Sequence, residues 1–201
     1  IFARQLALMR VIGGLPQPFD GEDEAMLNRL QLAIDGFDIL KDPEGDLVQL
    51  AMAMVDRPIS ILGPTELSPA LTRFKNQLNE NSARFVRVGT VPEMNHNESV
   101  AWGGVGNTQD PDAEQHVILL LAWQGIHPRV SHRMDWMVSH FSTDFAWRID
   151  GEGKTLLESL LYLCILMDWI SISLAFLHGK DPAEIKPIIA LKEFLATKTG
   201  K

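Results

Sequence analysis

Apolar residues recur along the chain with two different spacings. In the first 55 residues they recur every three or four positions, which is the spacing of one helix face. This spacing predicts three helices, over residues 1–12, 22–40 and 47–55. The glycine pair Gly13–Gly14 ends the first helix, and Asp20 or Asp23 is expected to cap the second at its N-terminus.

From about residue 56 onward, short apolar runs alternate with helical patterns. The runs predict strands over residues 57–64, 84–91, 116–123 and 144–150, and the helical patterns fall in 65–81, 127–141, 155–177 and 182–197. Regular alternation of buried strands with helices is typical of a parallel sheet covered by helices on both faces. We therefore predict an α/β fold.

The composition of the chain excludes several classes of function. The 201 residues allow one substantial domain with an appendage, and the net charge of -8, without a basic run, argues against a nucleic-acid partner. The single cysteine, Cys164, fits a reducing compartment such as the cytoplasm. The most apolar segment, residues 156–177, contains Glu158 and Asp168, so we expect a buried helix and no membrane partner.

Two of these segments leave alternatives open. Asp168 either pairs with another group in the interior or faces a subunit interface. Thr65 or Ser68 either caps the helix that follows residues 57–64 or belongs to a turn that binds an anion at the helix N-terminus.

The stretch from Phe74 to Trp102 crowds short polar side chains between apolar segments. Helix capping by asparagine explains part of this pattern, with a left-handed cap after residues 76–81 and an N-cap at Asn95 or Asn97. The alternative is chemical, because a carboxylate at Glu80 and an imidazole at His96 suit proton transfer, in one crevice or between two facing subunits. The side-chain amides of Asn79, Asn81 and Asn95 would then orient the carboxylate and the imidazole or hold sugar hydroxyls.

Two linked motifs in this stretch resemble a known family. "KNQLNEN" followed by "PEMNHNESVAW" is similar to the signature of bifunctional phosphoglucose/phosphomannose isomerases, in the second of their two sugar-isomerase (SIS) domains. Further similarity lies in "HPRVSHRM" and in the terminal pattern that includes Lys192. The resemblance implies an SIS-type three-layer αβα sandwich with a mostly parallel sheet of roughly five strands. It also implies linker helices over residues 1–45, the tail of a first SIS domain, and a C-terminal SIS domain over 46–201.

The resemblance implies a reaction and a set of roles. Glu80 would move a proton between C2 and C1 of a hexose 6-phosphate through an enediol, which links glucose 6-phosphate and mannose 6-phosphate to fructose 6-phosphate. His96 would assist ring opening in the site of the partner subunit, so a homodimer is implied, and Lys192 would approach the ring oxygen. Hydrogen bonds can stabilise an enediolate, so we expect neither a metal nor a cofactor.

Two features differ from the family pattern. Ala183 stands where the family usually has a threonine, and we find no Gly-Ser-rich phosphate loop in the chain. Because the first residue is Ile1, we expect this chain to be the C-terminal half of a longer isomerase, with the first SIS domain upstream. The alternative is a non-catalytic SIS module that binds a phosphosugar or serves regulation or dimerisation.

Overall fold

A four-stranded parallel sheet forms the centre of the protein. The computed structural model describes residues 2–16 and 21–198. The strands are β1 (Ile59–Pro64), β2 (Val86–Val91), β3 (Val117–Trp123) and β4 (Ala146–Gly151), in the order β2-β1-β3-β4. The α/β class is confirmed, but the described residues form four strands and not the roughly five expected. Between α7 (Leu156–Leu177) and residue 198 there is no further strand, because this segment has helical apolar spacing and forms α8 (Lys186–Ala196).

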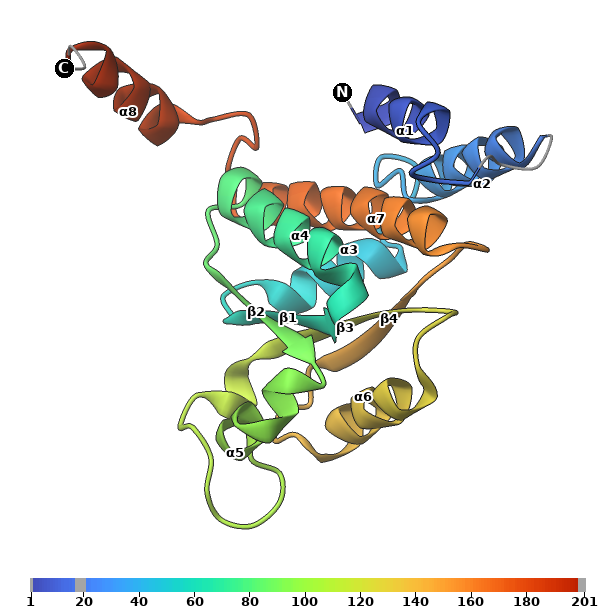
Figure 1. The fold of residues 1–201 in the computed structure, drawn as a ribbon. Coiled ribbons are helices and arrows are strands. Elements are labelled where there is room, and N and C mark those ends of the chain that lie inside the picture. The colour runs from blue at the N-terminus through green and yellow to red at the C-terminus, as the bar shows by residue number, and fades with distance from the viewer. Residues whose placement is uncertain (1, 17–20, 199–201) are drawn as a thin grey trace.

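Helices cover both faces of the sheet, as Figure 1 shows. The layer on one face consists of α3 (Asp46–Met54), α4 (Ser68–Asn81) and α7, which share one buried cluster with the sheet. The other face is covered by α5 (Glu98–Trp102) and α6 (Pro128–His140), with a second cluster. Three short 3-10 helices complete the connections: η1 (Thr65–Leu67), η2 (Glu93–His96) and η3 (Ala113–Gln115). Strand β3 is buried on both faces, which explains its unbroken apolar sequence.

Helix α7 lies within the first helical layer. Within the part of the chain that the structure describes, it is the one helix that is long and apolar enough to cross a membrane. It packs against α4 and α3, and also against α2 (Glu22–Gly36). Burial in this layer raises the pKa of the Cys164 thiol, so the thiol favours its neutral form. Packing within the described chain buries 39% of the most apolar window of α7.

The N-terminal helices are attached to the sheet domain through α7. Helix α2 ends at Gly36, before the predicted residue 40, and begins after Gly21 in a left-handed conformation. The expectation that Asp23 caps it is wrong, because Asp23 lies inside the helix and pairs with Arg10 of α1 (Phe2–Val11) at 2.5 Å. The other predicted cap, Asp20, lies outside the described residues.

A buried carboxylate joins α2 to the start of α7. Glu158 is 3% exposed and receives two bonds from Arg29, at 2.5 and 2.9 Å. It also accepts from the backbone N–H of Lys154, and its own N–H donates to the Thr155 hydroxyl. The hydrogen bond from Arg29, followed by that from Lys154, lowers the pKa of Glu158. Thr155 thus caps α7, and the Glu158 side chain holds α2 against the first turn of this helix.

The C-terminal end of α4 differs from the expected asparagine cap. The helix ends at Asn81 with Ser82 as its C-cap, and the residue with left-handed backbone is Ala83, at φ 54°. The N–H groups of Ser82 and Arg84 both reach the carbonyl of Leu78, which closes the helix end. An exposed alanine therefore occupies a conformation that favours glycine.

Replacing Ala83 with glycine should stabilise the protein. Relief of the left-handed strain outweighs the extra entropy of an unfolded glycine, so we expect the free energy of unfolding to rise by about 0.5–1 kcal/mol in urea titrations. The matched control is Ala25→Gly inside α2, which should lower the free energy of unfolding by about 1 kcal/mol. A loss of stability in Ala83→Gly would contradict the left-handed backbone conformation of Ala83.

Glu158→Gln should destabilise the protein by about 1–2 kcal/mol at pH 7, since Arg29 is only half-buried. The pKa of Glu158 is lowered by folding, so its contribution is complete above the ordinary value of 4.5 and is lost as the pH falls through the folded value. The stability difference between wild type and variant should therefore shrink below pH 4.5 in urea titrations. Glu44→Gln, in an exposed loop, serves as the control. A stability difference between wild type and Glu158→Gln that does not vary with pH would argue against the ion pair.

Candidate active site

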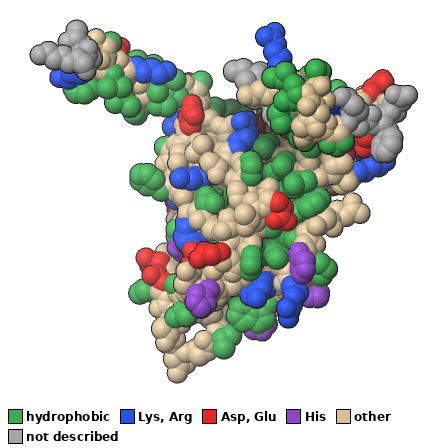
Figure 2. All heavy atoms as spheres, viewed as in Figure 1, with side chains coloured by type: hydrophobic (Ala, Val, Ile, Leu, Met, Phe, Trp, Pro, Cys, Tyr) green, Lys and Arg blue, Asp and Glu red, His purple; other side chains and the backbone are tan. Residues whose placement is uncertain are grey.

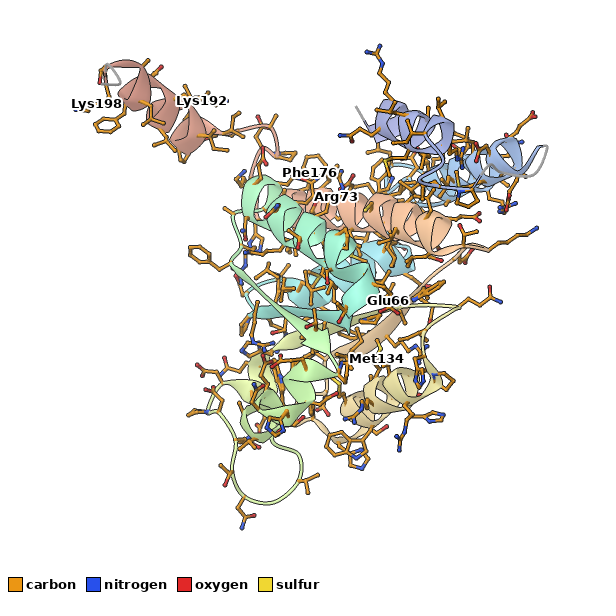
Figure 3. All side chains as sticks on the ribbon, in the orientation of Figure 1. Glu66, Arg73, Met134, Phe176, Lys192 and Lys198 are labelled. Atoms are coloured by element: carbon orange, nitrogen blue, oxygen red, sulfur yellow. The ribbon has the colours of Figure 1, made fainter. Side chains whose placement is uncertain are left out.

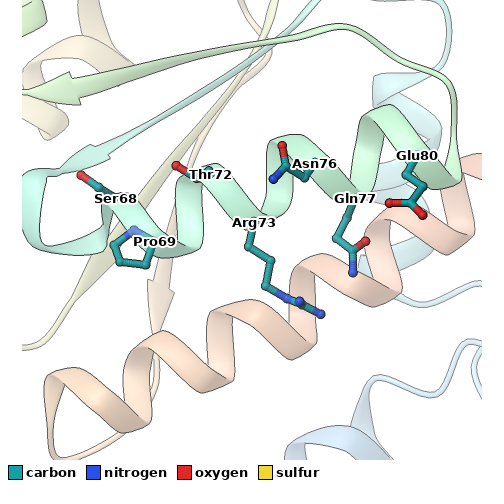
Figure 4. A pocket seen from close by; sticks show the side chains of 7 residues that line it. All are labelled: Ser68, Pro69, Thr72, Arg73, Asn76, Gln77 and Glu80. Carbon is teal, nitrogen blue, oxygen red and sulfur yellow. The ribbon is translucent and has the colours of Figure 1, made fainter. Parts of the chain in front are cut away.

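Glu80 lies in the last turn of α4, on the exposed polar face of that helix. An open groove of about 600 Å³ runs along this face, and Figure 4 shows Glu80 at its end. The groove is lined by residues that recur every three or four positions: Ser68, Pro69, Thr72, Arg73, Asn76, Gln77 and Glu80. A carboxylate here is open to solvent and has hydroxyl and amide groups beside it.

A row of polar contacts fixes α4 against α7. Asp168 of α7 accepts hydrogen bonds from Arg73 at 2.6 Å and Gln77 at 2.8 Å. One turn further, Asn81 donates to the Ser171 hydroxyl at 2.9 Å. Asp168 is thus paired within the chain, but its side chain is 32% exposed and not fully buried. The ion pair with Asp168 raises the pKa of the Arg73 guanidinium.

Lys180 holds the C-terminal end of α4. Its ammonium group lies 3.1 Å from the carbonyl oxygen of Glu80 and 3.0 Å from that of Asn81, and it also contacts the carbonyls of Asp181 and Glu184. A cation at a helix C-terminus is favourable because the free carbonyls there carry partial negative charge. Sequence reasoning missed Lys180, Arg73 and Gln77, because their partners lie far away along the chain.

The three predicted asparagines have different surroundings. Asn79 is exposed and does not line the groove of Glu80. The amide N–H of Asn81 is engaged with Ser171, so this residue connects two helices. Asn95 belongs to η2, where its amide contacts the sulfur atoms of Met94 and Met137. The structure therefore does not gather the three amides around Glu80.

His96 ends η2 and is exposed. This short helix follows β2 directly, so His96 lies at the carboxyl edge of the sheet. Glu80, by contrast, precedes β2, because α4 runs back to the amino edge. The two residues are separated by at least the length of a six-residue strand, about 17 Å. Within one chain Glu80 and His96 therefore do not share a crevice, and the alternative of two facing subunits is the one that the fold leaves open.

A hydrogen bond crosses the switch point of the sheet. The chain turns to opposite sides after β1 and β3, and ligands of open α/β sheets usually bind beyond the carboxyl ends of such strands. Here the indole N–H of Trp123 donates to Glu66 at 3.1 Å across this position. The expected capping of α4 by Thr65 or Ser68 is wrong, since Leu67 is the N-cap residue and the Ser68 hydroxyl instead donates to the Thr65 carbonyl.

Lys192 lies on α8, which extends away from the rest of the protein, as Figure 3 shows. None of the residues of this helix is buried. Lys192 is therefore not brought to Glu80 or His96 by contacts within the described chain. Among the described residues, no group of three or more His, Cys, Asp or Glu side chains is arranged to hold a metal ion.

Residues 45–195 match the family model described as bacterial phospho-glucose isomerase C-terminal SIS domain. The chain belongs to this family. The match includes β1 to β4 and both polar motifs of the Phe74–Trp102 stretch. The resemblance seen in the sequence is thus confirmed, and with it the placement of the chain as a C-terminal SIS domain.

Individual relatives agree with this family. The bifunctional phosphoglucose/phosphomannose isomerase of Aquifex aeolicus is 36% identical over 127 residues, which cover 61% of this chain and 38% of that protein. The protein of the same name from Thermoplasma volcanium is 30% identical over 125 residues, covering 62% of this chain and 38% of its own length. This SIS domain therefore corresponds to well under half the length of these relatives.

Solved structures agree with the fold. A glucose-6-phosphate isomerase like protein from Thermus thermophilus has a TM-score of 0.59 at 16% identity, with 75% of this chain and 48% of that chain covered. Glucosamine-6-phosphate deaminase from Thermotoga maritima has a TM-score of 0.58 at 12% identity, and the match covers 87% of this chain and 49% of that chain. At these identities the likeness concerns the fold alone.

Proposed function

We propose that this SIS domain is the C-terminal half of an isomerase that interconverts glucose 6-phosphate or mannose 6-phosphate with fructose 6-phosphate. The observation that carries the proposal is the position of Glu80, an exposed carboxylate at the end of a polar groove within the family's asparagine-glutamate-asparagine motif. Residues 1–45 would connect it to a first SIS domain, and the substrate phosphate would be held there.

Glu80 would act as the base that carries one proton between two carbon atoms. It would take the proton from C2 of the open-chain aldose, which gives an enediol, and return it to C1 to give the ketose. The hydroxyl and amide groups that line the groove, such as Thr72 and Asn76, would donate to the enediolate oxygens. Lys180 and the Asp168 contacts support this role because they fix the backbone that carries Glu80.

His96 would act in the site of a second copy. Proton transfer to the ring oxygen requires an acid close to the sugar, and one chain holds Glu80 and His96 at opposite edges of its sheet. Two copies that face each other would bring the His96 of one to the Glu80 of the other, so the proposal requires a homodimer. Lys192 would join this site only when α8 packs against the assembled protein.

Glu80→Gln should abolish isomerisation in the complete natural protein. We expect kcat for fructose 6-phosphate to fall by at least about a thousandfold, because glutamine cannot accept the proton, while KM changes little. Glu93→Gln, an exposed glutamate of η2, is the matched control and should keep its activity. Unchanged turnover in Glu80→Gln would remove the assigned mechanism. A wild-type protein that binds the phosphosugar without turnover would favour the non-catalytic module.

Mixing two inactive variants should restore activity if sites are shared between copies. A dimer of Glu80→Gln with His96→Gln contains one intact site and one doubly altered site, so random mixing should recover about a quarter of the wild-type turnover. The measurement is kcat after the two variants are refolded together, against each variant alone. No recovery from a mixture in which hybrid dimers have formed would show that His96 does not act across subunits.

A further inference from the structure

Helix α6 presents a basic and aromatic face on an acidic protein. Arg129 and Arg133 are one turn apart, as are His132 and Trp136, and all four are exposed along one side of the helix. Figure 2 shows blue and purple side chains together on the surface where Figure 1 draws α6. The whole chain carries a net charge of -8, so this concentration of positive groups is local.

The two arginines of this face are not used by the fold. Among the described residues, neither guanidinium has an ion pair or hydrogen bond, in contrast to nearby Arg148, which binds Asp135, Asp150 and Ser131. The carboxylate of Asp135 in α6 is therefore already paired with a residue of β4. Like charges at positions i and i+4 of a helix repel each other, so the pair is mildly unfavourable for folding. Stability alone does not explain the arginine pair.

A groove of about 530 Å³ runs beside these side chains, and η2 and α5 form its other wall. Asn95 and Ser99 contribute that wall. The Oδ1 atom of Asn95 is buried and has no hydrogen-bond partner among the described residues, which is unusual for a buried amide oxygen. Trp136 is 41% exposed, and its ring stacks on His140 with an angle of 13° between the planes. The groove thus combines two arginines with an aromatic surface.

We propose that this groove binds a small phosphate ester. Arginine guanidinium groups match the oxygen geometry of a phosphate, and two of them supply the positive charge that such a dianion needs. The carbon skeleton of the ester would pack against Trp136. The volume suits a small molecule.

This groove is separate from the groove of Glu80 in the same chain. Helix α6 covers one face of the sheet and α4 covers the other. A ligand bound beside Trp136 therefore does not reach Glu80 through the sheet, which is one strand layer flanked by two helical layers. The inference goes beyond the proposed isomerisation and does not depend on it, because binding can be measured without turnover.

The test is a titration of this chain with inorganic phosphate and with glycerol 3-phosphate at constant ionic strength. Binding is followed by the NMR signals of the His132 ring and the Trp136 indole. We expect both signals to shift, glycerol 3-phosphate to bind more tightly than phosphate, and Arg129→Gln/Arg133→Gln to weaken binding at least tenfold. The control Arg4→Gln/Lys41→Gln removes the same charge from other exposed positions and should bind within twofold of wild type.

Equal weakening in the two double variants would overturn the proposal, since it would reduce the effect to net charge. Absence of shifts at His132 and Trp136 in the wild-type chain would overturn it as well. Thermal unfolding of Arg129→Gln/Arg133→Gln should be unchanged or slightly higher, because a repulsive pair is removed, so lost binding would not come from misfolding. An active isomerase without phosphate binding at α6 would refute this inference and leave the proposed function intact.

Discussion

The seam between α4 and α7 is the interaction on which the candidate site depends. These two helices form the most extensive helix–helix contact of the described chain, and polar side chains mark its exposed side. Asp168 is the centre, because it binds Arg73 and Gln77 at once. An apolar seam would tolerate sliding by one turn, whereas these bonds specify a single register. The position of Glu80 follows from that register and from the bond between Lys180 and the Glu80 carbonyl.

The direction of the chain in a parallel sheet imposes a second constraint. Every helix that joins two parallel strands runs opposite to them, so a residue at its end lies at the amino edge. Glu80 obeys this rule, and His96, directly after β2, lies at the carboxyl edge. A hydrogen bond from Trp123 to Glu66 crosses the usual binding position at the switch point. Within one SIS domain the two motifs thus place Glu80 and His96 at opposite edges of the sheet.

The sequence was sufficient for the fold because its signals are local. The run of β3 is unbroken and apolar, and α7 has a threonine cap followed by a glutamate three positions on. The sequence signals gave wrong predictions where contacts with another helix or strand determine the local structure. The sequence predicted an asparagine at the end of α4, but Asn81 is engaged by Ser171 of α7, and Ala83 takes the left-handed position. The contacts around the candidate site could likewise not be predicted, because those of Asp168 join residues more than ninety positions apart.

Helix α8 shows the same limit for Lys192. An isolated helix of this length, 11 residues, is marginal in water, and helices in proteins are stabilised mainly by packing of an apolar face. Three apolar residues of α8, Leu191, Phe194 and Leu195, are more than half exposed, and no residue of the helix is buried. A motif can therefore assign a role to Lys192, but the described contacts do not fix the position of its ammonium group.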